Sequence, residues 1–132
     1  MSIAYVIERL EMASGPDRDL DELIAAALFP EHEFMQLKDA PEGVGCMMYR
    51  WPDGQQVSAL RATSSIDAAV KLYELVLPRH DLFIENYGGE WFSSIKDRFE
   101  KKTYMSRANC KNGAIATCQA ILSALQAKGE AR

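Results

Sequence analysis

The sequence predicts an α+β domain in which an antiparallel β-sheet built from hairpins has helices packed on it, in an α-β-α sandwich-like arrangement. Two observations lead to this class. Apolar residues at helical spacing mark several segments, and β-type runs occur in pairs around turn sequences. The 132 residues suit one compact domain, so we expect residues 1–132 to share a single core.

Residues 1–29 are expected to form a helical hairpin. The first helix starts after Ser2, a good N-cap residue, and the second starts near residue 17 and stops before Pro30. Acidic side chains in the first turns of the second helix favour the positive end of the helix dipole. These acids are Asp17, Asp19, Asp21 and Glu22. We interpret Asp19 with Glu22, and Asp21 with Glu22, as a solvated helix start rather than as catalytic pairs.

The middle of the chain predicts a loop, a hairpin and a third helix. Residues 31–43 are polar and indicate a loop, with a brief extended piece at 34–37. A Pro-Asp-Gly-Gln turn at 52–55 between two β-type runs predicts a β-hairpin over 45–61. A cap at 63–65 and the terminating Pro78 then bound a helix over 64–77.

The last part predicts a second hairpin and a final helix. Gly88 and Gly89 turn a hairpin or meander over 81–107, with a further strand near 103–107. Alternation places Trp91, Ser93 and Ile95 on one face of that sheet. The helix over 113–128 has its apolar stripe at Ile115, Cys118, Ile121, Leu122 and Leu125.

Composition and motifs exclude several classes of protein. The chain has no apolar run of the roughly 20 residues that a membrane span needs, and no secretory signal pattern, so we expect a cytoplasmic protein with no membrane contact. Three cysteines without CxxC spacing and two isolated histidines predict neither metal nor cofactor. Because GxSxG and glycine-rich phosphate loops are absent, we expect no catalysis; a small enzyme using Cys110 or His80 is the alternative.

Charge is distributed unevenly along the chain. Residues 1–43 hold ten acids and three bases, net −7, whereas residues 44–132 hold nine acids and twelve bases, net +3. The pI of about 5.2 argues against duplex nucleic acid. Such asymmetry favours an anionic ligand or self-association, and we expect a homo-oligomer.

The basic stretch 96–111 is the candidate ligand-binding segment. Cationic side chains there would hold phosphate groups, and an aromatic ring would stack on a base. The alternative is a solvated, charged strand edge that deters aggregation. The candidate residues are Arg98, Lys101, Arg107 and Lys111 for phosphate, with Tyr104 or Trp91 for stacking.

Three segments resemble the phage ABA sandwich domain family of small phage and prophage accessory proteins. They are residues 7–21, the Ser-Ile-Asp-Ala-Ala helix start at 65–69, and the C-terminal helix at 116–125. The chain departs from the family pattern in its longer central helix and its basic stretch. The resemblance implies a phage origin and a helix/sheet/helix sandwich, and it brings no catalytic residues.

Two functional hypotheses follow. The first is a non-catalytic anti-defence sponge that sequesters a nucleotide-derived immune signal, a small anionic ligand, in the host cytoplasm. This rests on the basic stretch and on analogy with other phage accessory proteins. The alternative is a protein-protein inhibitor or virion accessory protein that engages a basic partner through the acidic helical face at Asp19, Asp21 and Glu22.

Overall fold

The computed structural model describes residues 3–28, 35–36, 47–50, 56–58, 61–106 and 110–130. The helices in these ranges are α1 (Ile3–Met12), α2 (Arg18–Leu28), α3 (Ile66–Val76) and α4 (Gly113–Glu130). One antiparallel sheet contains β1 (Met35–Gln36), β2 (Met47–Arg50) and β3 (Gln56–Ser58). The other contains β4 (His80–Tyr87), β5 (Glu90–Asp97) and β6 (Thr103–Met105).

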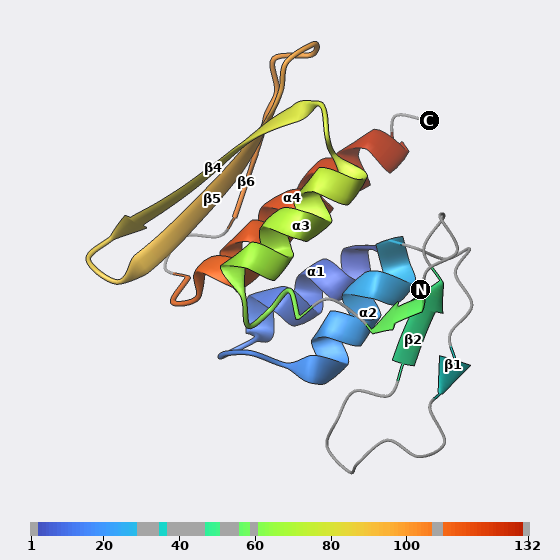
Figure 1. Cartoon of the computed structure of the whole chain (residues 1–132). Helices are drawn as coiled ribbons and strands as arrows, with labels where there is room; N and C mark the ends of the chain where they lie inside the picture. Colours follow the sequence, from blue (N-terminus) through green and yellow to red (C-terminus); the bar gives the residue numbers. More distant parts are fainter. Residues whose placement is uncertain are drawn as a thin grey trace.

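The α+β class is confirmed, with antiparallel hairpins and helices packed on a sheet. Helix α4 packs on one face of β4–β6, with α3 and α1 beside it and α2 against α1 (Figure 1). The order of layers is therefore the β4–β6 sheet, then α3 and α4, then α1 and α2. This refines the sandwich-like expectation, because the helices in the described part of the chain lie on a single face of that sheet.

Both predicted hairpins are present. Strands β2 and β3 pair with Tyr49 opposite Val57, while the predicted turn at 52–55 lies outside the described residues. Strands β4 and β5 pair along their whole length around Gly88 and Gly89. Both glycines have positive φ, 60° and 89°, as a two-residue hairpin turn of the primed type requires.

Helix α4 is the centre of the molecule. Every residue from 113 to 122 is buried, including Thr117 and Gln119 as well as four residues of the predicted apolar stripe, while the fifth, Leu125, is partly buried. Alanines on the other sides of the helix allow α1, α3 and β5 to approach closely, and Leu10, Leu72 and Ile95 fill the space between them. None of the described helices is long and apolar enough to cross a membrane.

The interpretation of Asp21 as a solvated helix-start residue is wrong. Its side chain is 3% exposed, and Oδ1 accepts hydrogen bonds from the Thr63 backbone N–H at 2.8 Å and the Thr63 hydroxyl at 2.7 Å. Asp17 caps the helix instead, because its Oδ1 accepts from the Leu20 N–H at 3.2 Å. Asp21 thus ties the start of α2 to the segment that precedes α3.

Candidate functional site

A cleft of about 850 Å³ opens where α3 ends, near the last turns of α4. Its apolar wall comes from the four described helices and from the β5–β6 turn. Its polar side chains come from the segment between α3 and β4, from β4 and β5, from the β5–β6 turn and from α4. The lining residues used below are Leu75, Leu77, Arg79, His80, Asp97, Phe99, Leu125 and Lys128. This volume is within the range of small-molecule sites.

His80 provides the most unusual polar group in this cleft. Pro78 follows α3, the chain turns, and His80 becomes the first residue of β4, with its side chain on the face that carries the helices. The residue is 7% exposed, yet Nδ1 has no hydrogen-bond partner and Nε2 has only the long contact of 3.5 Å with Asp97 Oδ2. Buried polar atoms are nearly always paired, so an imidazole with an unpaired nitrogen in a cleft indicates a place for a ligand or water.

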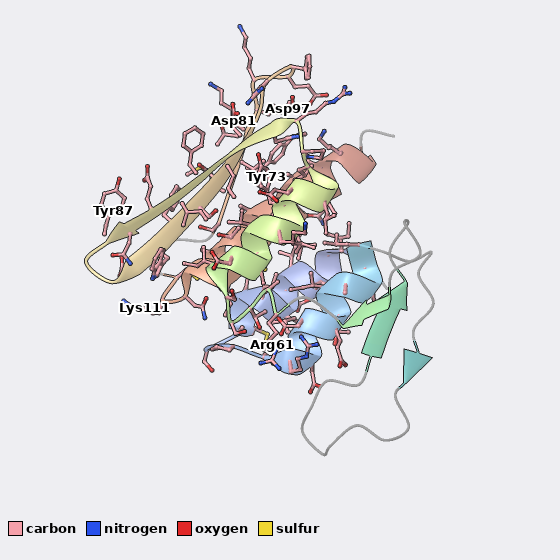
Figure 2. The ribbon with its side chains drawn as sticks, in the orientation of Figure 1. Arg61, Tyr73, Asp81, Tyr87, Asp97 and Lys111 are labelled. Carbon is pink, nitrogen blue, oxygen red and sulfur yellow. The ribbon has the colours of Figure 1, made fainter. Side chains whose placement is uncertain are left out.

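Asp97 lies opposite His80 in the β4–β5 pair. Figure 2 shows Asp97 near Asp81, at the end of the sheet where β4 begins and β5 ends. Its Oδ1 accepts from the backbone N–H groups of Glu100 at 3.1 Å and Phe99 at 2.8 Å. These bonds hold the pKa of the Asp97 carboxyl below its ordinary value. The other carboxylate oxygen, Oδ2, lies 3.5 Å from His80 Nε2 and 3.7 Å from Lys128 Nζ. The negative charge of Asp97 therefore lies between the imidazole and the ammonium group.

The imidazole of His80 is favoured in its neutral form. Burial lowers its pKa, the nearby Lys128 ammonium lowers it further, and the carboxylates of Asp97 and Asp81 oppose these effects. On the backbone side, the Tyr73 hydroxyl of α3 donates a hydrogen bond to the His80 carbonyl and fixes the start of β4. A neutral imidazole can donate one hydrogen bond and accept another, and an anion placed beside it would favour its protonation.

The lining chemistry favours binding over nucleophilic catalysis. Leu75, Leu77 and Leu125 present apolar surface, while Arg79 and Lys128 supply positive charge. The described lining contains no hydroxyl or thiol that His80 could activate. Within the described residues, no group of three or more His, Cys, Asp or Glu side chains is arranged to hold a metal ion.

The structure separates the predicted ligand-binding residues. Arg98 forms an ion pair with Asp81, in which Nη2 lies 2.6 Å from Oδ1. Lys101 is exposed in the β5–β6 turn, where its φ is 56°. Lys111 is exposed near the other end of β5, with Nζ 3.3 Å from the carboxylate of Glu90. Arg107 lies outside the described residues.

The two candidate aromatic residues face the helices. Tyr104 is opposite Ile95, and both Tyr104 and Trp91 are partly buried against the core. Trp91 and Asp97 are six residues apart on one strand, roughly 20 Å at ordinary strand rise. Trp91 and Lys111 therefore cannot share a small-molecule site with Arg98 and Lys101.

Sequence reasoning missed Asp97 and Lys128 and treated His80 as isolated. One signal was present, because a two-residue turn at 88–89 fixes the register of its hairpin and places residue 80 opposite residue 97. Lys128 could not be added by such reasoning, since its position depends on how α4 packs against the sheet.

No family model, curated protein or solved structure matches this chain. The resemblance to the phage ABA sandwich domain family therefore stays a prediction from sequence. The functional argument below rests on the geometry of the cleft.

Proposed function

We propose that the protein is a non-catalytic binding protein that holds a small anionic ligand of nucleotide type in the cleft at His80. Sequestration of a nucleotide-derived immune signal is the role we propose for it. The observation that supports this most is the buried imidazole of His80, whose Nδ1 has no hydrogen-bond partner and whose Nε2 has only the long contact with Asp97.

The lining of the cleft contains cationic donors for an anion, although its formal charges balance. Lys128 and Arg79 contribute two cations to the lining, against the carboxylates of Asp97 and Glu100. Oδ1 of Asp97 accepts from two backbone N–H groups, and Oδ2 lies 3.5 Å from His80 Nε2 and 3.7 Å from Lys128 Nζ. The unpaired Nδ1 of His80 and the other N–H groups of the Lys128 ammonium would bind a phosphate or carboxylate. Charge-assisted hydrogen bonds to such a group are roughly twice as strong as neutral ones.

The apolar part of the cleft favours a ligand that also carries a flat or apolar group. Phe99 lines the cleft and is 80% exposed, so its ring is available to a base without rearrangement of the core. Base-aromatic stacking contributes about 1–3 kcal/mol per base. An anionic group and a ring on one small molecule are the combination found in nucleotides.

Calorimetric titration against inorganic phosphate, cyclic ADP-ribose isomers and cyclic dinucleotides tests this function. We expect binding by at least one nucleotide, weakened about tenfold or more by Lys128→Ala, because the substitution removes a cation from the cleft. Lys71→Ala is the matched control, since Lys71 is an exposed lysine on α3 outside the cleft lining. No binding by any member of the panel would refute the proposal.

Two further variants separate this site from the basic stretch. We expect Lys101→Ala and Lys111→Ala to leave the affinity nearly unchanged, because neither residue lines the cleft. Loss of binding in these variants alone would move the site to the exposed edge of the sheet. Mass spectrometry of the recovered ligand should show an unchanged mass, and a new mass would indicate an enzyme.

A protein-protein inhibitor acting through the acidic helical face has less support. Asp21 is buried and paired with Thr63, and Asp17 caps α2. Of the acids proposed for that face, Asp19 is exposed and Glu22 is partly exposed. Two neighbouring carboxylates, at i and i+3 on α2, make a small surface for a basic partner.

A further inference from the structure

The two ring nitrogens of His80 have different surroundings. Nε2 faces the carboxylate oxygen Oδ2 of Asp97 at 3.5 Å, whereas Nδ1 is buried and has no hydrogen-bond partner. A neutral imidazole carries a proton on one nitrogen and a lone pair on the other. A lone pair on Nε2 would be repelled by the negative charge of Asp97. The proton is therefore favoured on Nε2, and Nδ1 is left with the lone pair.

An imidazole with its lone pair on Nδ1 cannot donate a hydrogen bond from that atom. A phosphate group that carries no proton has only acceptor oxygens, so it would meet the lone pair of Nδ1 without forming a bond. Uptake of a second proton removes this conflict, because both nitrogens of an imidazolium donate. Nε2 then donates toward Asp97, and Nδ1 donates to the ligand.

The position of Asp97 opposite Nε2 is fixed by its other contacts. Oδ1 accepts from the backbone N–H groups of Phe99 at 2.8 Å and Glu100 at 3.1 Å, which hold the β5–β6 turn. Oδ2 also lies 3.7 Å from Nζ of Lys128 on α4. The carboxylate cannot turn away from His80 without the loss of these contacts, so the same tautomer is favoured whenever the turn is formed.

Histidine is the side-chain type around this site whose ordinary pKa lies nearest neutral pH. The described lining residues from α1 and α2 are apolar. Tyr73 of α3 contributes a hydroxyl, and burial raises its pKa, so it stays uncharged near neutral pH. The charged groups come from the other neighbouring elements: Asp97 from β5, Lys128 from α4, Glu100 from the β5–β6 turn, Arg79 from the segment before β4, and Asp81 from β4 itself.

We propose that Asp97 is a positioning residue that makes anion binding at His80 proton-coupled, so that the ligand and one proton bind together; this rests on the proposed function of the cleft. The protein then captures its ligand in mildly acidic solution and releases it as the pH rises. Above about pH 6.5, where the free imidazole is neutral, the affinity should fall by up to about tenfold per pH unit until the complex has lost its proton.

Calorimetric titration in buffers of different ionisation enthalpy measures the protons taken up with the ligand. Cyclic dinucleotides and cyclic ADP-ribose isomers are the probes, because their phosphate groups have no proton that titrates near neutral pH. We expect the natural chain to take up as much as one proton per bound ligand. His80→Gln should take up none, whereas His32→Gln, which changes the other histidine of the chain, should behave as the natural chain does.

Asp97→Asn distinguishes control of the proton from a merely structural role. The amide oxygen can still accept from the two N–H groups of the turn, and the amide NH2 group then faces Nε2 and moves the imidazole proton to Nδ1. This variant should bind without proton uptake, with an affinity that changes little with pH. Asp81→Asn is the matched control and should retain the uptake, because Asp81 is outside the cleft lining and pairs with Arg98.

Nitrogen NMR of the free protein near neutral pH shows which nitrogen of His80 carries the proton. We expect Nε2 in the natural chain and Nδ1 in Asp97→Asn, with circular dichroism to verify the fold of both. A proton on Nδ1 in the natural chain, ligand binding without proton uptake, or uptake retained in Asp97→Asn would overturn the proton coupling and leave the binding function standing. Absence of binding by every probe would instead contradict the binding function itself, and the coupling with it.

Discussion

Asp21→Ala is the substitution that separates the two interpretations of the acidic helix start most clearly. The Thr63 hydroxyl keeps an alternative acceptor, the Asp17 carbonyl at 3.1 Å. The buried N–H of Thr63 loses the oxygen that accepts from it, Oδ1 of Asp21 at 2.8 Å. One unpaired buried donor and the lost charge-assisted bonds cost about 3 kcal/mol together. For a domain of this size that corresponds to a fall in Tm of roughly 10 °C.

Asp19→Ala is the control for this comparison. Asp19 is exposed, lies two residues earlier on α2, and makes the same change in charge and in helix propensity. Both variants therefore gain about 0.5 kcal/mol from the higher helix propensity of alanine, and both lose the interaction of a carboxylate with the helix dipole. Urea unfolding measures the difference in free energy of unfolding between Asp21→Ala and Asp19→Ala, provided that the two variants have equal m-values. Free energies of unfolding that agree within about 0.5 kcal/mol would refute the buried role of Asp21.

Three further outcomes are expected. Gly113→Ala should lower the free energy of unfolding by about 1–3 kcal/mol, because a Cβ there would lie 2.6 Å from the Trp91 ring. Gly129→Ala is the control and should not lower it, because the space around Gly129 is open. Equal effects of the two substitutions in urea unfolding would contradict the close packing of Gly113 against Trp91. Cys118, wholly buried with a raised pKa, should resist iodoacetamide until the chain unfolds, and rapid labelling of the native protein would contradict its place in the core. Stability should rise with pH toward about 6.5, because the folded state depresses the His80 pKa and the unfolded chain binds more protons. His80→Gln should reduce that slope by up to about 1.4 kcal/mol per pH unit, and an unchanged slope in urea titrations would count against a neutral, buried imidazole.

Local sequence patterns were sufficient to predict the described helices and hairpins. Turn chemistry located both described hairpins, and the capping Ser65, whose side-chain oxygen accepts from the Ala68 N–H at 3.2 Å, marked the start of α3. Period-two alternation also placed Trp91, Ser93 and Ile95 on one face of the sheet, and in the structure the helices cover that face. These features depend on residues close together in the chain, so a single sequence contains them.

The candidate site depends on contacts between distant segments. The basic stretch looked continuous in sequence, but β5, its turn and β6 distribute it over both ends of the sheet and two faces. Asp21 was assigned to solvent because helix position alone does not reveal Thr63, which is 42 residues away. His80, Asp97 and Lys128 meet only when α4 packs across the sheet, and no local pattern specifies that packing.

The most direct test of the cleft as an anion site is the titration of the His80 imidazole by NMR. A His32→Gln background leaves one histidine resonance to follow. In the free protein we expect the His80 pKa to lie below 6.5, and a bound nucleotide from the panel should raise it, because the anionic group stabilises the imidazolium. A His80 resonance that no nucleotide of the panel shifts, at any pH, would contradict the proposed site.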